Sequence, residues 1–484
     1  MLRRKLCFFL VAYFLLCIQG LAQAPTEISR FLRLPGMEGS TLTCAIRDLS
    51  TGETLCAYQE SLQITPASVL KLVTTATALE LLGSDYRFPT TLAYDGHIAD
   101  GTLHGNLYII GSGDPSLGSS HFPQSTDFLE KWVNTIRSAG IRRVEGAVIA
   151  DERIFDTEGV SPKWVYEDLG SYYGAGSYGI SVFDNLYRLS LRTVGGKVRV
   201  IGTSPEGAVA KFHNYLRSAP VRTDSCYIIG APFADERFLY GVIPAGREQY
   251  TIKGDLPDPP LFLARYFSGE LEKQGISVAR PATTYRLLSE KEEVKTDART
   301  TLITTYSPTL ARIVYQTNHK SINLFADALL KAIGLRHEAR DGEYLSSFRK
   351  GIRVLKAFWR AKGLDVEGLH LYDGSGLAPT DRTTARFIAD LLAYMATQSS
   401  ERESFRQSLP RAGMEGSVRN FLKNTSLEGK ARLKSGSMSR TRGYAGFVER
   451  DGKHYALAIF LNNYDANVSL TTKGLGDLID TLIP

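Results

Sequence analysis

The chain has 484 residues, of which 43% are hydrophobic and 22% are charged, which is ordinary for a globular protein with a sizeable core. The composition excludes a disordered or collagen-like chain. The formal net charge of +6 is too small and too scattered to indicate a nucleic acid partner. The length predicts about three domains, or one domain that carries a large insertion.

Residues 1–22 are predicted to be a secretory signal peptide. Basic residues at positions 3–5 precede the apolar run 6–18, and small residues follow it. The run is short for a membrane span. Cleavage is expected after Ala22, because Pro25 disfavours cleavage directly before it. The pattern favours export over the two alternatives, an uncleaved membrane anchor and a lipid anchor on Cys17.

Three cysteines remain after this segment, and two of them flank a predicted turn. Cys44 and Cys56 lie in predicted strands 41–47 and 54–58, on either side of the turn at residues 49–52. A hairpin would place them opposite one another, and export permits a disulfide. Two small buried thiols are an equal alternative. No cysteine has the spacing of a metal site, and no metal or organic cofactor is expected.

After this hairpin the predicted secondary structure is first helical and then rich in short strands. Thr65 and Pro66 are predicted to be the N-cap and first residue of a helix over 67–82, which Gly83 ends. Residues 86–295 are rich in short strand, glycine and turn patterns, with helical patches at 126–139 and 261–274. We expect this stretch to be inserted material with a nested sub-lobe at 188–255.

Helical periodicity returns near residue 307 and gives way to strands near the end of the chain. Helices are predicted over 309–316, 322–333, 345–362, 384–395 and 475–482, and a hairpin over 444–449 and 454–461. We therefore expect an α+β domain, built from residues 23–85 and 296–484, that the insertion 86–295 splits.

The predicted helix over 67–82 carries Ser68 and Lys71, three residues apart and therefore on one face. A lysine whose pKa is lowered by burial or by a second cation can take the proton of a serine nucleophile. The spacing alone is common: Ser347 and Lys350 share it, and we interpret that pair as a solvated helix face. The apolar helix around Lys71 separates the two cases. No zinc-protease, nucleophile-elbow or phosphate-loop motif is present.

Two further triplets could complete such a site. Lys434-Ser435-Gly436 precedes the final hairpin and is predicted to lie on an edge strand, where a peptide could bind. The triplet Ser321–Asn323 opens a predicted helix, where Ser321 is also a plausible N-cap. The sequence thus predicts that three distant segments converge and that one hydroxyl, that of Ser68, faces the amines of Lys71 and Lys434.

These three motifs resemble those of the penicilloyl-serine transferases. More narrowly, the chain is similar to the class C low-molecular-mass penicillin-binding proteins, the D-alanyl-D-alanine carboxypeptidase/endopeptidases. The closer match is carried by stretches at 65–83, 111–118, 164–179, 372–384 and 434–447. The resemblance runs from about residue 35 to the end. It implies a serine β-lactamase/DD-peptidase-like fold, an antiparallel sheet flanked by helices, with the insertion between the first two motifs.

The resemblance also implies a role for each matching residue. Ser68 would be acylated and Lys71 would be its general base. The other catalytic residues would be Ser321, Asn323 and Lys434. Substrate contacts would come from Ser435, Gly436, Ser437, Asp168 and Tyr173. Among these, the backbone N–H groups of Ser68 and Ser437 would form the oxyanion hole, and Asp168 would meet the free amino group of a diaminopimelyl side chain.

The implied substrates are peptidoglycan stem peptides ending in D-Ala-D-Ala and D-Ala–diaminopimelate crosslinks. The implied site of action is the periplasm. β-Lactam antibiotics would acylate the same serine. Two alternatives remain: a serine β-lactamase, for which we find no acidic deacylation motif, and a catalytically silent peptidoglycan-binding relative. Oligomeric state does not follow from the sequence.

Overall fold

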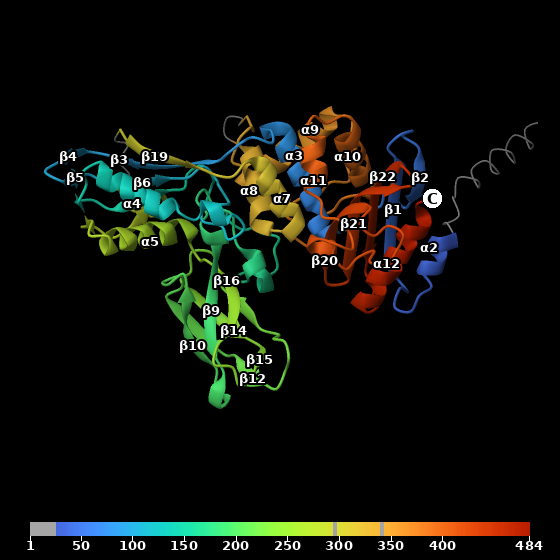
Figure 1. Cartoon of the computed structure of the whole chain (residues 1–484), viewed down its shortest axis with the longest axis horizontal. Helices are drawn as coiled ribbons and strands as arrows, with labels where there is room; N and C mark the ends of the chain where they lie inside the picture. The colour runs from blue at the N-terminus through green and yellow to red at the C-terminus, as the bar shows by residue number, and fades with distance from the viewer. Residues whose placement is uncertain (1–25, 294–297, 339–342) are drawn as a thin grey trace, which may run out of the picture.

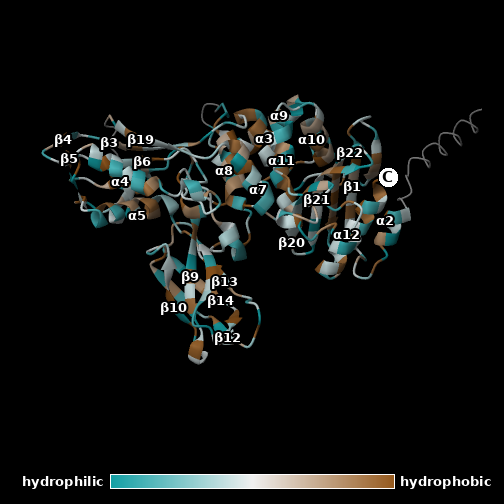
Figure 2. Cartoon of the chain, viewed as in Figure 1, coloured by the Kyte–Doolittle hydropathy of each residue, from teal (hydrophilic) through white to brown (hydrophobic). Residues whose placement is uncertain are grey.

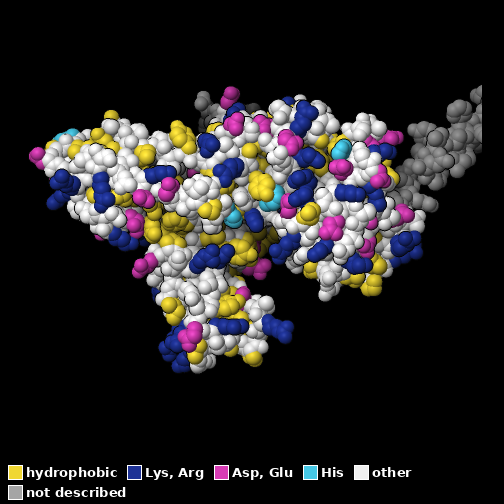
Figure 3. All heavy atoms as spheres, viewed as in Figure 1, with side chains coloured by type: hydrophobic (Ala, Val, Ile, Leu, Met, Phe, Trp, Pro, Cys, Tyr) yellow, Lys and Arg dark blue, Asp and Glu magenta, His cyan; other side chains and the backbone are white. Residues whose placement is uncertain are grey.

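The computed structural model describes residues 26–293, 298–338 and 343–484, so the predicted signal peptide lies outside the described residues. The chain forms a main lobe from both ends of the sequence, a second lobe to its side, and a sub-lobe below the second (Figure 1). Charged side chains of both signs are interspersed over the face shown in Figure 3. None of the described helices combines the length and apolar content that a membrane span needs.

The main lobe is built on an antiparallel five-stranded sheet in the order β2-β1-β22-β21-β20. Its strands are β1 (Thr41–Asp48), β2 (Thr54–Tyr58), β20 (Ala431–Met438), β21 (Thr441–Arg450) and β22 (Lys453–Asn462). Early strand β1 pairs with late strand β22, with Cys44 opposite Ile459, and β2 pairs with the other side of β1. Strand β20, which carries the Lys434 triplet, lies at the edge as predicted.

Helices cover both faces of this sheet. One face packs on α2 (Thr26–Phe31) and α12 (Val468–Leu482) through a hydrophobic core of its own. The other face packs on a larger helical layer, made of α3 (Lys71–Leu82), α7 (Leu310–Lys320), α8 (Asn323–Gly334), α9 (Ser347–Ala361), α10 (Ala385–Thr397) and α11 (Arg402–Gln407). Helices α3 and α8 are hydrophobic along much of their length, because they lie inside this layer (Figure 2). The expected α+β class is confirmed.

The second lobe contains two mixed sheets and helices, among them helices at the predicted helical patches 126–139 and 261–274. One sheet has the order β18-β8-β6-β3-β19 and the other β17-β7-β5-β4. The strands are β3 (Pro89–Tyr94), β4 (His97–Ala99), β5 (Thr102–His104), β6 (Leu107–Ile110), β7 (Arg143–Val144), β8 (Val148–Asp151), β17 (Ser277–Val278), β18 (Thr283–Thr284) and β19 (Thr300–Tyr306); the helices are α4 (Phe128–Ser138), α5 (Pro259–Lys273) and α6 (Tyr285–Glu290). Strand β19 pairs with β3, so this sheet extends past residue 295.

The sub-lobe is formed mainly by short strands. They are β9 (Leu186–Arg192), β10 (Arg199–Ser204), β11 (Lys211–Asn214), β12 (Arg217–Ala219), β13 (Tyr227–Ile229), β14 (Glu236–Tyr240), β15 (Val242–Pro244) and β16 (Tyr250–Asp255). Residues of β9 such as Leu189 join one hydrophobic cluster with Trp132 and Phe267 of the second lobe. We propose that the second lobe and the sub-lobe are one inserted unit, because they share this core.

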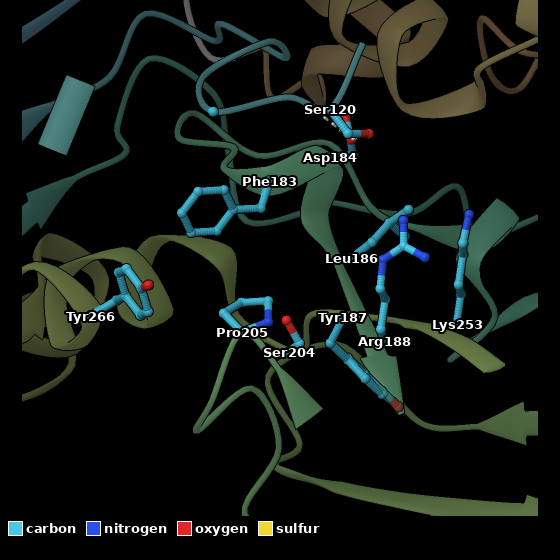
Figure 4. A pocket seen from close by; sticks show the side chains of 11 residues that line it. Ser120, Phe183, Asp184, Leu186, Tyr187, Arg188, Ser204, Pro205, Lys253 and Tyr266 are labelled. Carbon is cyan, nitrogen blue, oxygen red and sulfur yellow. Dashed lines mark hydrogen bonds between the residues drawn. The ribbon is translucent and has the colours of Figure 1, made fainter. Parts of the chain in front are cut away.

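The chain enters the sub-lobe through a left-handed turn. Phe183, Asp184 and Asn185 have φ values of 52°, 61° and 52°, a conformation that costs free energy in residues other than glycine. The Asn185 amide holds the turn, since its Nδ2 donates to Gly176 O at 2.8 Å and its Oδ1 accepts from Val182 N at 2.9 Å. A cavity of about 320 Å³ opens beside this turn, with Arg188 and Phe183 among the residues that line it (Figure 4).

Two predictions about the first hairpin and helix need correction. The helix begins at Ala67 with a tight 3₁₀ turn rather than with a Thr65 cap, and the Thr65 hydroxyl instead contacts Pro379 O at 3.4 Å. Gly83 does end α3, with its N–H bonded to Leu79 O. Cys44 and Cys56 are free, buried thiols. Cys44 pairs with Tyr58 and not with Cys56, so the residues are not directly opposite as the symmetric hairpin required.

The packing of α9 on α8 generates a test of the fold. A Cβ added at Gly351 would lie 2.2 Å from the carbonyl oxygen of Leu330 in α8. We expect Gly351→Ala to lower the free energy of unfolding by about 1–3 kcal/mol, because the two helices must separate to admit the methyl group. Gly269→Ala in α5 is the matched control, since nothing lies within 4 Å of its added Cβ. Calorimetry should show a lower unfolding temperature for the first variant only.

Candidate active site

The Ser68 hydroxyl lies on a tight turn against the sheet edge. The turn is a 3₁₀ element, η1 (Ala67–Leu70), that leads directly into α3. Ala67 has φ 45°, a left-handed conformation that holds the backbone bent just before the serine. Strained backbone of this kind is a known feature of reactive residues. The helix start also leaves N–H groups of the first turn free for developing negative charge.

Two glycines allow neighbouring segments to press against this turn. A Cβ on Gly436 of β20 would lie 2.5 Å from Pro66 O, and one on Gly376 would lie 2.0 Å from Ala67 O. Gly376 also has φ 75°, which favours glycine. The sheet edge and the 373–378 loop can therefore approach the Ser68 backbone from two sides only because neither glycine carries a side chain.

Lys71 is the centre of the hydrogen-bond network. Its side chain has no exposed surface, and its Nζ lies 2.9 Å from Ser68 Oγ, as the sequence predicted. The same Nζ donates to Asn323 Oδ1 at 2.6 Å and to the Ser375 carbonyl at 2.7 Å. Burial lowers the pKa of Lys71 to about 8, even though nearby carboxylates favour its charged form. An amine with this pKa is partly neutral at physiological pH and can accept a proton.

Lys434 brings a second buried amine to the site. Its Nζ donates to Ser321 Oγ at 2.9 Å and to Ser435 O at 2.8 Å. Burial and the charge of Lys71 hold the pKa of Lys434 well below its usual range. The Ser68 hydroxyl therefore contacts Lys71, as predicted, while Lys434 bonds the hydroxyl of the second motif.

The second motif occupies the junction between α7 and α8. Ser321 has φ 58° and ends α7, and Ile322 rather than Ser321 is the N-cap of α8. The Ser321 hydroxyl is thus free of a capping role and points to Lys434. Asn323 opens α8, where its Oδ1 accepts from Lys71 and its Nδ2 donates to Tyr173 O at 2.8 Å. Asn323 therefore links Lys71 to the loop that carries Tyr173.

The third motif presents its remaining groups along the edge strand. Ser435 Oγ lies 2.8 Å from Ser417 Oγ, a residue that sequence reasoning missed. Ser417 belongs to a short turn over Gly416–Val418 that contacts β20. Ser437 is exposed on the same strand, and Gly436 is buried between them. Two hydroxyls and an open strand edge could receive a peptide carboxylate and its backbone.

The inserted segment reaches the site through the loop at residues 164–174. Asp168 is 6% exposed and ends a 3₁₀ turn over Tyr166–Asp168, and burial raises its pKa to about 6. Tyr173 has a partly exposed ring, and its carbonyl bonds Asn323 as described above. The structure therefore brings this loop against the second motif through Tyr173, whereas Asp168 forms no hydrogen bond with the three motifs in the part of the chain that the structure describes.

A cluster of buried carboxylates behind Lys71 was not foreseen as part of the site. Asp327, Asp373 and Asp381 are each fully buried, and Asp373 borders the Ser375 carbonyl that Lys71 contacts. The stretch 372–384 was singled out in the sequence only as a similarity, without a role. The sequence signal was the run Asp-Gly-Ser-Gly at 373–376. Aspartate and glycine at these positions are typical of a tight turn, so a turn could have been predicted here.

The second pair with the same spacing has a structural role. Ser347 at the start of α9 is 6% exposed, so the prediction of a solvated face is wrong for this residue. Its hydroxyl accepts from Asp156 N at 3.2 Å, and its own N–H bonds Asp156 Oδ2. Ser347 therefore joins the second lobe to α9 and is not a second nucleophile.

The chain is similar to known proteins over nearly its whole length. Residues 25–481 match the D-Ala-D-Ala carboxypeptidase 3 (S13) family. A D-alanyl-D-alanine carboxypeptidase of Actinomadura sp. (strain R39) is 26% identical over 466 residues, which cover 94% of this chain and 83% of the relative.

Solved structures show the same fold. Penicillin binding protein 4 (dacB) from Haemophilus influenzae has a TM-score of 0.78 at 19% identity, over 95% of this chain and 99% of its own. The same protein complexed with a novel β-lactam has a TM-score of 0.75, at the same identity and coverage. With the family match spanning both ends of the main lobe and all three motifs, this chain belongs to the D-Ala-D-Ala carboxypeptidase 3 (S13) family and is a serine DD-peptidase.

Proposed function

We propose that the enzyme cleaves D-alanyl peptide bonds of peptidoglycan through an acyl-enzyme on Ser68. The observation that carries this proposal is the 2.9 Å contact between Ser68 Oγ and the fully buried Nζ of Lys71. Neutral Lys71 takes the hydroxyl proton while Ser68 Oγ attacks the carbonyl carbon of the penultimate D-alanine. The N–H groups of Ser68 and Ser437 stabilise the resulting oxyanion.

The second half of the reaction uses the other amine. The pair formed by Ser321 and Lys434 passes a proton to the leaving amine as the C–N bond breaks. Ser435 holds the terminal carboxylate of the substrate. Water then hydrolyses the ester on Ser68, and the serine regains its proton. This substrate lies outside the cytoplasmic membrane, so we place the enzyme in the periplasm.

The free ends and the crosslinks of peptidoglycan differ in the group beyond the scissile bond. A carboxypeptidase releases D-alanine, whereas an endopeptidase releases a diaminopimelyl amine. The open edge of β20 accommodates either leaving group, since Ser435 and Ser437 face outward from it. We propose that Asp168 selects for a diaminopimelyl side chain, because a buried carboxylate beside the cleft can pair with its ammonium group.

Ser68→Ala should abolish covalent labelling by a fluorescent penicillin and the release of D-alanine from a stem pentapeptide. The matched control is Ser347→Ala, which changes the serine of the other Ser-x-x-Lys pair and should leave labelling intact. Mass spectrometry of the labelled protein should find the adduct on the peptide that contains Ser68. Rapid turnover of penicillin without a stable adduct would indicate a β-lactamase, and binding without D-alanine release would indicate a silent relative.

Lys71→Arg should reduce the acylation rate by about 10²-fold or more, because arginine keeps the charge and cannot give up its proton. In the unchanged enzyme the acylation rate should rise with pH up to about 8, the pKa of Lys71, since only the neutral amine is a base. Stopped-flow measurement of penicillin acylation between pH 5 and pH 9 checks both points. An acylation rate in the arginine variant close to that of the unchanged enzyme would rule out the proposed base.

Asp168→Asn should weaken kcat/KM on peptides with a free diaminopimelyl amine and spare peptides that lack it. Glu167→Gln is the control, since Glu167 is adjacent and exposed. The selectivity of the unchanged enzyme should also fall below about pH 6, where Asp168 becomes protonated. Muropeptide digestion followed by mass spectrometry provides the comparison. Equal losses on both kinds of peptide would make Asp168 a structural residue.

A further inference from the structure

The hydrogen bonds of Lys71 show which way its lone pair faces when it is neutral. A neutral amine has two N–H donors and one lone pair, and its Nζ here has three oxygen partners. The Asn323 amide oxygen and the Ser375 carbonyl can only accept, so they take the two donors. Ser68 Oγ is the one partner with a proton to give. The Ser375 carbonyl is therefore as necessary as Asn323 for aiming the lone pair at Ser68.

The turn that carries the Ser375 carbonyl is held mainly by Asp373, with one further bond from Gly374 N to Asp327 Oδ1 at 2.8 Å. Asp373 Oδ1 accepts from Ser375 N at 3.0 Å and Gly376 N at 2.6 Å. Its Oδ2 accepts from Ala378 N at 2.8 Å and from Trp164 Nε1 at 2.7 Å. Four donors converge on a side chain with no exposed surface, and only an ionised carboxylate can accept all four.

The fourth donor links two parts of the site. Trp164 belongs to the inserted segment and directly precedes the turn over Tyr166–Asp168. Asp373 therefore fastens the loop that carries Asp168 to the loop that contacts Lys71. The same two loops meet again at Asn323, which bonds both Lys71 and the Tyr173 carbonyl.

We propose that Asp373 is a positioning residue for the catalytic base: it folds the 373–378 turn so that the Ser375 carbonyl orients Lys71, and through Trp164 it fixes the loop that carries Asp168. The inference rests on the proposed role of Lys71 as general base. Asp373 does not touch Ser68 or the substrate. Its effect is geometric, through the carbonyl, and electrostatic, through its charge near Lys71.

Several titratable groups lie close to Lys71. Lys434 of β20 faces Lys71 from one side, and Asp327 of α8, Asp373 and Asp381 face it from the other. Burial raises the pKa values of Asp327 and Asp381 well above their usual range, and the charge of Asp373 adds to both shifts. All three carboxylates favour the ammonium form of Lys71, and of the three it is Asp373 that bonds both Ser375 N and Trp164 Nε1.

Asp373→Asn and Asp365→Asn form a pair of isosteric substitutions, one beside the site and one at the surface. The asparagine amide at 373 would present N–H donors to Ala378 N or Trp164 Nε1, so the turn should shift. We expect the rate of acylation by fluorescent penicillin to fall about 100-fold, the cost of a misplacement of about 1 Å. Asp365 is exposed, and its Oδ1 accepts from Glu367 N. The acylation rate of Asp365→Asn should stay near that of the unchanged enzyme.

The pH profile distinguishes positioning from a merely structural role. Loss of the Asp373 anion should lower the pKa of Lys71, so the residual acylation of Asp373→Asn should begin at lower pH than in the unchanged enzyme. Asp365→Asn should leave the profile in place. Equal rates for the unchanged enzyme and Asp373→Asn, or equal losses for the two variants with unshifted profiles, would overturn the inference.

Trp164→Phe keeps the proposal testable if Asp373→Asn does not fold. This variant keeps the carboxylate and removes one donor, so acylation should fall less than in Asp373→Asn. Selectivity for peptides with a free diaminopimelyl amine should fall as well, because the Asp168 loop is released. Unchanged selectivity would contradict the link between the loops. If the unchanged protein acquires no penicillin label at all, the proposed function fails, and the inference fails with it.

Discussion

The site depends on a lysine amine that is buried out of contact with solvent. Lys71 has no exposed surface, and burial of an unpaired ammonium group is costly unless other groups compensate. Here the compensation comes from neutral oxygens of Ser68, Asn323 and Ser375. The Asp373 carboxylate supports them, since it accepts a hydrogen bond from Ser375 N. The arrangement keeps the amine in place without fixing its charge. That balance is what a general base near neutral pH requires.

The same requirement explains the close approach of the backbone around Ser68. The partners of Lys71 lie 252 and 304 positions away along the chain, so they must be delivered by packing. The sheet edge and the 373–378 loop both press on the turn before Ser68, at Pro66 and Ala67. A side chain at either contact would push one hydrogen-bond partner out of reach, and the site is therefore as sensitive to backbone spacing as to its reactive groups.

The inserted segment is attached to the site through α8. Asn323, the first residue of this helix, donates to Tyr173 O. Lys331, two turns later and also buried, donates to Glu158 O at 2.7 Å and Ser177 O at 2.6 Å. The second lobe therefore contacts the helix that carries the second motif at both of its ends. This attachment lets loops from the insertion border the cleft while their own core stays separate.

Local patterns in the sequence were sufficient to predict the helices, the terminal hairpin and the edge position of Lys434, because amphipathic period, caps and turn residues act over a few positions. The Ser68–Lys71 contact was predictable for the same reason, since both residues lie on one helical face. Local patterns failed where a residue's partner is distant. Ser321 could be a cap or a catalytic hydroxyl, and only the packing of β20 against the α7–α8 junction brings it to Lys434.

Other features were decided by tertiary structure alone. The Cys44 and Cys56 thiols touch but are free, and the register between β1 and β2 sets them diagonally, with Cys44 opposite Tyr58 and Cys56 opposite Ile46. Asp373 connects two distant loops because Trp164, 209 positions earlier in the chain, donates a hydrogen bond to its carboxylate. The sequence by itself determined which chemical groups are available and which short elements carry them. Their convergence depends on long-range contacts and on burial, and burial is also what lowers the pKa of Lys71, so the reactivity of the site was decided by the fold.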